Sequence, residues 1–136
     1  MTSREVIEKF RQLELELAQE RGDFVFFALF MLENVPDRWD LMISARWLDT
    51  DKRRAIRYLA DQIKAKLGVE YLICLSRIIV IDPDKAQLHD LARSIAEEHG
   101  AVEHGKVRIR DDELFGVLVK DARIITVKVP SAPAAT

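Results

Sequence analysis

The fold is decided by one stretch that holds both tryptophans of the chain, Trp39-Asp40-Leu41-Met42-Ile43-Ser44-Ala45-Arg46-Trp47-Leu48-Asp49. In a β-strand, successive side chains point to opposite faces of the sheet. Here the odd-numbered residues up to Trp47 are apolar, whereas the even-numbered ones include Asp40, Ser44 and Arg46. The stretch therefore predicts a central strand with one face in the core and a more polar opposite face.

A helix and a second strand are predicted before this stretch. Apolar residues at helical spacing predict a helix over residues 3–20. The aromatic and β-branched run 24–32 predicts a strand that is buried on both faces. The polar break at 33–38 predicts a turn, and we therefore expect this strand to pair antiparallel with the tryptophan strand.

A helix and a third strand are predicted after the tryptophan strand. An apolar stripe predicts a helix that begins near Asp49 or Thr50, which can cap its first amides, and that ends at Gly68. Residues 69–75 are expected to form a short helical or irregular piece. The apolar segment 77–81 predicts a strand that is covered on both faces.

The remainder predicts one more helix and two or three strands. The helix is expected to take Asp82 as its cap and Pro83 as its first residue, and to end at Gly100. Alternating apolar and polar residues then predict short strands joined by turns. The strands are expected at 106–110, 114–119 and 123–129, with the turns at 111–112 and 120–121.

Length and composition indicate one globular unit. A chain of 136 residues with 49% hydrophobic and 32% charged residues fits a single folded domain. We predict an α/β (or α+β) domain over residues 1–129, followed by a disordered tail at 130–136. Its mixed sheet of about five to six strands is covered by three main helices, in the order α-β-β-α-β-α-β-β-β.

Charge and hydropathy argue against several classes of protein. A formal net charge of −2 gives no overall attraction to nucleic acid or to an anionic membrane. The longest apolar run, 24–32, is about half the length of a membrane-spanning helix, and the N-terminus is charged where a signal peptide is apolar. The single cysteine, Cys74, allows no internal disulfide and no set of zinc thiolates. These features predict a cytoplasmic protein without membrane contact.

Two similar segments follow the second and third predicted strands. They read Leu48-Asp49-Thr50-Asp51-Lys52 and Ile81-Asp82-Pro83-Asp84-Lys85. Either helix capping selects the same residues twice, or the strand and helix are duplicated. If the two strands are parallel with a right-handed crossover, both segments lie at the same carboxyl edge of the sheet. That edge is where open α/β sheets usually bind ligands.

Acidic and basic side chains at this edge could bind a phosphate-bearing ligand. Carboxylates bind Mg²⁺ together with waters and a substrate phosphate, although helix capping accounts for the same aspartates. The basic residues stand in the first turns of a helix, where the macrodipole disfavours cations, so they either receive an anion or form a solvated face. The candidate ligand-binding residues are Arg46, Asp49, Asp51, Arg53, Arg54, Asp82 and Asp84.

No motif identifies a reaction. The apolar run that ends in Asp82-Pro83-Asp84 resembles the nucleophile motif of haloacid dehalogenase-like phosphatases, in which the first aspartate attacks phosphorus and the second acts as acid and base. The resemblance covers these few residues, and Ala86 occupies the position where that family has threonine or valine. The histidines His89, His99 and His104 are expected to be structural.

Three functions are compatible with these features. The first is a non-catalytic binding or assembly protein that self-associates through an exposed strand edge or the first helix and needs no cofactor or metal. The alternative is an enzyme or sensor that binds a nucleotide-like phosphate ligand with Mg²⁺ at the carboxyl edge. A second alternative is nucleic-acid binding through Lys106, Arg108 and Arg110 together with the basic helix.

Overall fold

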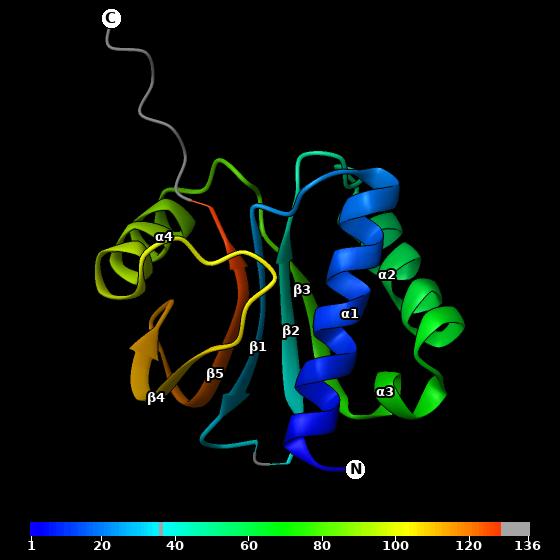
Figure 1. Ribbon diagram of the computed structural model, residues 1–136, viewed down its shortest axis with the longest axis horizontal. Coiled ribbons are helices and arrows are strands. Elements are labelled where there is room, and N and C mark those ends of the chain that lie inside the picture. The colour runs from blue at the N-terminus through cyan, green and yellow to red at the C-terminus, as the bar shows by residue number, and fades with distance from the viewer. Residues whose placement is uncertain (36, 129–136) are drawn as a thin grey trace, which may run out of the picture.

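The computed structural model describes residues 1–35 and 37–128. The predicted disordered tail at 130–136 lies outside the described residues. One mixed sheet has the strand order β3-β2-β1-β5-β4, in which β2 and β3 are parallel and the other neighbours antiparallel (Figure 1). The predicted α/β class is confirmed. The strands are β1 (Phe26–Leu32), β2 (Trp39–Ser44), β3 (Leu75–Val80), β4 (Val107–Leu114) and β5 (Val117–Val127).

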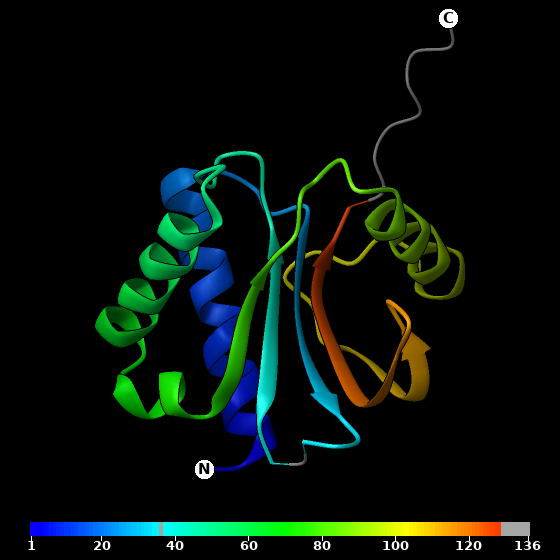
Figure 2. The same cartoon turned by 180° about the vertical axis from the view of Figure 1, so that it is seen from behind.

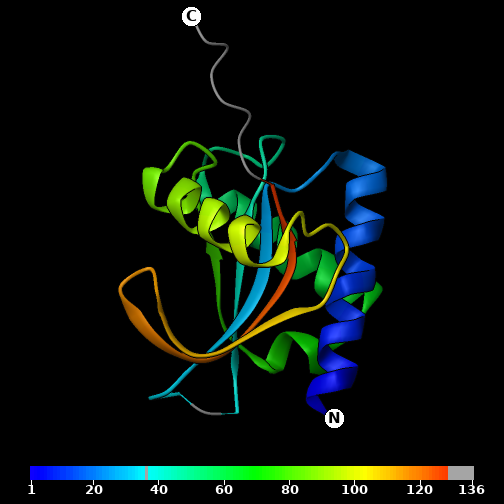
Figure 3. The same ribbon diagram turned by 60° about the vertical axis from the view of Figure 1, so that its left-hand side comes forward.

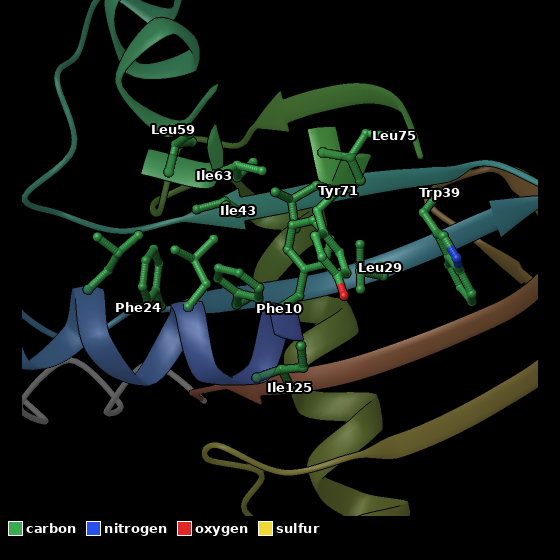
Figure 4. Close-up of a cluster of buried hydrophobic side chains, with 14 of the residues drawn as sticks. Phe10, Phe24, Leu29, Trp39, Ile43, Leu59, Ile63, Tyr71, Leu75 and Ile125 are labelled. Atoms are coloured by element: carbon green, nitrogen blue, oxygen red, sulfur yellow. The ribbon is translucent and has the colours of Figure 1, made fainter. Parts of the chain in front are cut away.

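Helices cover the two faces of the sheet separately. One face carries α1 (Ser3–Arg21), α2 (Lys52–Lys66) and the short α3 (Val69–Ile73), and the opposite face carries α4 (Ala86–His99) (Figures 1 and 2). The apolar stripes of α1 and α2 pack on side chains of β1 and β2, which form the core shown in Figure 4. No helix within the described residues has the length and apolar character needed to span a membrane.

The tryptophan strand, β2, lies inside the sheet between β1 and the edge strand β3, whereas β1 is the central strand, and β2 is shorter than predicted. It ends at Ser44, and the chain then turns, with the Leu48 amide donating to the Ala45 carbonyl at 3.3 Å. Trp47 is therefore not part of the strand. Its indole is half-buried against Phe24, at a ring distance of 5.2 Å. The face predicted to be more polar is also buried, because α4 and the neighbouring strands cover that side.

The helix starts differ from the prediction because aspartates form turns before them. Asp51, rather than Asp49 or Thr50, caps α2 by accepting the amides of Arg53 and Arg54. Asp82 does not cap α4. Its carboxylate instead accepts the Asp84 amide at 2.8 Å, and α4 begins only at Ala86. An aspartate that bonds the amide two residues later favours a turn over a helix.

The last two strands are longer than predicted and form one hairpin. Asp111 and Asp112 lie within β4, and residues 120–121 lie within β5, so neither pair forms a turn. The turn is instead at Phe115 and Gly116, whose φ angles are 53° and 76°, between the paired Leu114 and Val117. Two consecutive positive φ angles are typical of the tight type I′ hairpin turn. The hairpin curves toward the face that carries α4 (Figure 3).

The two outer strands differ in how much they are covered. β3 was expected to be covered on both faces, but it is an edge strand whose Ile78, Ile79 and Val80 are half-buried. β4 forms the other edge and exposes mainly charged residues. Asp111 has a φ of 50° there, which interrupts the regular strand geometry.

Candidate functional site

The loops after β2 and β3 meet at one edge of the sheet. Because the two strands are parallel, their carboxyl ends lie together, and both loops are at the same end of the molecule (Figure 2). From there α2 packs on one face of the sheet and α4 on the other. This divergence is the topological switch point where open α/β sheets usually bind ligands. A cavity of about 270 Å³ lies at this position.

Both loops contribute side chains to the cavity. The lining carries two cationic side chains, three carboxylates, one hydroxyl and several apolar groups. The loop after β2 with the first residue of α2 provides Ala45, Arg46, Leu48, Asp49, Thr50 and Lys52, and the end of β3 with its loop provides Val80, Ile81, Asp82, Pro83 and Asp84. Four predicted candidate residues, Arg46, Asp49, Asp82 and Asp84, are therefore brought together around one cavity.

Arg46 and Asp84 form an ion pair between the two loops. The Arg46 Nη2 donates to Asp84 Oδ1 at 3.0 Å, and the side chains are 61% and 70% exposed. The hydrogen bond from Arg46 holds the pKa of Asp84 below its ordinary value, and the bond to Asp84 raises the pKa of Arg46. Ion pairs this exposed add little to stability, because water screens them.

The other aspartates of the edge also serve local structure. Asp49 Oδ1 accepts the Asp51 amide at 2.8 Å, Asp82 accepts the Asp84 amide, and Asp51 caps α2. Capping therefore accounts for Asp51 alone, whereas Asp49 and Asp82 form the same kind of turn before the two helices. Within residues 1–35 and 37–128, no group of three or more acidic, histidine or cysteine side chains is placed to hold a metal ion. A Mg²⁺ ion would take part of its coordination from a ligand phosphate and water.

Three candidate residues do not line the cavity. Asp51 and Arg53 contribute to the start of α2, and Arg54 lies beside Asp49 and Asp51 at 4.0 and 3.8 Å. Arg54 lines a neighbouring hollow of about 140 Å³ together with Trp47. Lys52, one of the basic residues predicted in the first turns of this helix, does line the cavity.

The two basic groups of the nucleic-acid hypothesis lie far apart in the sheet order. Lys106, Arg108 and Arg110 lie on and just before β4, whereas the basic turns of α2 follow β2, toward the opposite edge. Lys106 pairs with Glu8 at 2.8 Å, and Arg108 contacts Asp121 through two nitrogens, at 3.0 and 2.9 Å. The two groups therefore do not form one continuous basic face.

A buried polar cluster lies under α1, and its carboxylate was not predicted from the sequence. Glu14 is fully buried, and its two oxygens contact the His104 Nδ1 and the Thr126 hydroxyl, the latter at 3.0 Å. The same hydroxyl accepts the His104 amide at 3.0 Å, and Arg11 donates to the His104 carbonyl at 2.6 Å. The cluster joins α1 to β5 and to the loop before β4. Glu14 stands four residues after Phe10, on the apolar stripe, and this position was the available signal.

A larger hollow lies at the opposite end of the sheet. It measures about 670 Å³ and is lined by Leu32, Glu33, Asn34, Val117 and Leu118. Ligand sites combine apolar walls with several convergent polar groups. This lining provides one charged side chain, so the smaller cavity at the carboxyl edge is the better candidate.

Comparison of the chain with family models, curated proteins and solved structures gives no match.

Proposed function

We propose that this protein is a non-catalytic binding protein that holds a small phosphate-bearing ligand together with Mg²⁺ in the cavity between the ends of β2 and β3. The observation that supports it is the cavity at the topological switch point, to which both loops contribute charged side chains. Arg46 and Lys52 are the cations that face it. Both suit a phosphate, Arg46 through its planar fork and Lys52 as a point charge.

The charges of the lining favour a phosphate that arrives with a cation. Three carboxylates, Asp49, Asp82 and Asp84, surround the two cations, so a bare anion meets a net negative charge. Mg²⁺ binds through one or two carboxylates, waters and phosphate oxygens, and it offsets this repulsion. The cavity of about 270 Å³ is slightly smaller than the roughly 300–1,000 Å³ of sites for drug-sized ligands. A mononucleotide or a smaller phosphate ester matches this size.

Binding is favoured over catalysis because the carboxylates serve local structure. Asp49 and Asp82 accept backbone amides, and Asp84 pairs with Arg46, each through one oxygen, so the second oxygen of each can help to coordinate an ion. A general base works best with a pKa near the working pH, whereas Arg46 holds the pKa of Asp84 below its ordinary value.

Thermal unfolding with mononucleotides and Mg²⁺ tests this function. A ligand that binds the folded state raises the melting temperature. We expect a rise when both are present, and little change with either alone or after EDTA is added. Arg46→Gln should abolish the rise, whereas Arg93→Gln should retain it. Arg93 is a matched control, because it is 62% exposed and lies 3.9 Å from Asp90, on α4 and outside the cavity. An unchanged wild-type melting temperature would contradict the proposal.

Self-association through β3 is a second candidate, supported by the contrast between the sheet edges. In the described part of the chain, β3 pairs with β2 alone, and its Ile78, Ile79 and Val80 are half-buried. The adjacent α3 exposes Val69 and Ile73, at 56% and 61%. An edge strand is a template for pairing with another chain, and the one charged side chain of β3, Arg77, already pairs with Asp40 of β2. α1 is less suitable because its apolar face packs on the sheet.

Solution mass, measured by light scattering or sedimentation, tests the second candidate. We expect a dimer at micromolar concentration that Ile73→Lys dissociates, because the new charge lies beside β3. Leu118→Lys is the control, since Leu118 is 62% exposed but lies on β5. A monomeric wild-type protein, or equal dissociation by both substitutions, would exclude assembly through β3.

A further inference from the structure

The Arg46–Asp84 pair connects two loops that leave the sheet in different directions. Arg46 follows β2, Asp84 follows β3, and both line the cavity. The loops do not depend on this pair for their shape. The Lys85 amide donates to the Asp82 carbonyl at 3.0 Å, and the Leu48 amide donates to the Ala45 carbonyl at 3.3 Å. Backbone bonds therefore hold each loop separately.

The Arg46 guanidinium is only partly used by this pair. Its Nη2 bonds to Asp84, and its Nε and Nη1 have no hydrogen-bond partner among the described residues. Asp82 acts on Arg46 through its charge, without a hydrogen bond to it. A guanidinium binds phosphate through two parallel N–H groups. Because Asp84 occupies one N–H group of Arg46, the others remain available to a phosphate.

We infer that Asp84 is an internal competitor for Arg46: it occupies the guanidinium while the cavity is empty, and a ligand phosphate displaces it. The inference rests on the proposed function and deepens it, because it names the residue that sets the affinity for phosphate. The exposure of both side chains supports the exchange, since a solvated ion pair is broken at little cost. An anion then binds in the cavity only if it interacts with Arg46 more strongly than Asp84 does.

Titration with inorganic phosphate in EDTA tests the exchange without Mg²⁺, and it is carried to concentrations at which the weak binding of a bare anion is detectable. The measurement is the NMR shift of the Arg46 Nε–H group, which reports directly on the guanidinium. Asp84→Asn should tighten phosphate binding about two- to five-fold, the range that corresponds to the free energy of an exposed ion pair. Asp82→Asn is the matched control. It removes the same charge from the same loop, and asparagine retains the turn that Asp82 forms.

The outcomes separate the inference from the proposed function. A larger gain in Asp84→Asn than in Asp82→Asn supports competition for Arg46. Equal gains in the two variants would mean that each carboxylate weakens phosphate binding through its negative charge alone. This result would overturn the inference. It is also overturned if neither the wild type nor Asp84→Asn binds phosphate, or if Asp84→Asn does not tighten it. The proposed function fails on a different readout, the absence of a melting-temperature rise with nucleotide and Mg²⁺.

Discussion

Two polar contacts of the molecule lie in opposite environments. Solvent reaches the Arg46–Asp84 pair at the carboxyl edge, whereas the Glu14–His104–Thr126 cluster lies under α1. The Arg46 and Asp84 side chains are 61% and 70% exposed, whereas Glu14 is fully buried. Water can replace either partner of the exposed pair, so that pair is free to exchange with a ligand. A carboxylate removed from water depends on its protein partners. Burial therefore separates a charge pair that suits binding from one that holds the fold together.

Loss of the histidine partner should produce the largest effect on stability. His104→Asn leaves the buried carboxylate of Glu14 with the Thr126 hydroxyl as its remaining partner. Leaving a buried polar group without its partner costs about 1–3 kcal/mol of unfolding free energy, and more where the group is a fully buried carboxyl such as Glu14. Asparagine tolerates the φ of 52° at this position, so backbone strain adds little. Urea unfolding of the variant and the wild type measures the loss.

Two further variants show whether the loss comes from the buried carboxylate. His99→Asn is the control, because the His99 side chain is 33% exposed, compared with 28% for His104, and contacts the exposed Glu98. Adding Glu14→Gln to His104→Asn removes the buried charge and should recover part of the stability. If His104→Asn costs no more than His99→Asn, the cluster does not hold α1 in place.

The sequence features that predicted the fold are local. Helical spacing of apolar residues predicted α1, and the strand-helix-strand order predicted that the segments at Asp49 and Asp82 share one edge of the sheet. Alternation predicted β2 but extended it to Trp47. The segment after Ser44 alternates in the same way, although the chain turns there. Periodicity shows which residues suit a strand, and it does not show where hydrogen bonding to the neighbouring strands ends.

The features that were missed depend on contacts between distant parts of the chain. Glu14 and His104 are ninety residues apart, so neither residue indicates the other in the sequence. The hairpin turn at Phe115 was missed because a bulky residue with a positive φ lacks the usual turn signature. Asp121 was expected in a turn, but Arg108 and Arg123 pair with it and stabilise it within β5. Tertiary partners override local preference at these positions.

An intermediate effect is expected where one partner is buried and the other exposed. The Asp40 side chain is 5% exposed, that of Arg77 is 57% exposed, and the Arg77 Nη2 lies 2.6 Å from Asp40 Oδ2. Arg77→Gln should cost about 1–3 kcal/mol, the penalty for a buried polar group without its partner. Urea unfolding measures this cost, with Arg93→Gln as the exposed control. Equal stability of the two variants would mean that water reaches Asp40 and compensates it.

The smallest effect on stability is expected at Arg46–Asp84, where the effect on titration should still be clear. Arg46 lowers the pKa of Asp84, so the pair stabilises the folded state above the ordinary aspartate range and loses this contribution as the pH falls through the lowered pKa. In Arg46→Gln, the Asp84 pKa measured by carboxyl NMR should rise toward its ordinary value, while the urea midpoint at neutral pH stays unchanged. The pKa of Asp23, which Lys128 lowers, should not move and serves as the internal control. An unchanged Asp84 pKa would show that the two side chains do not pair in solution, and the exchange of Asp84 for phosphate would then lose its basis.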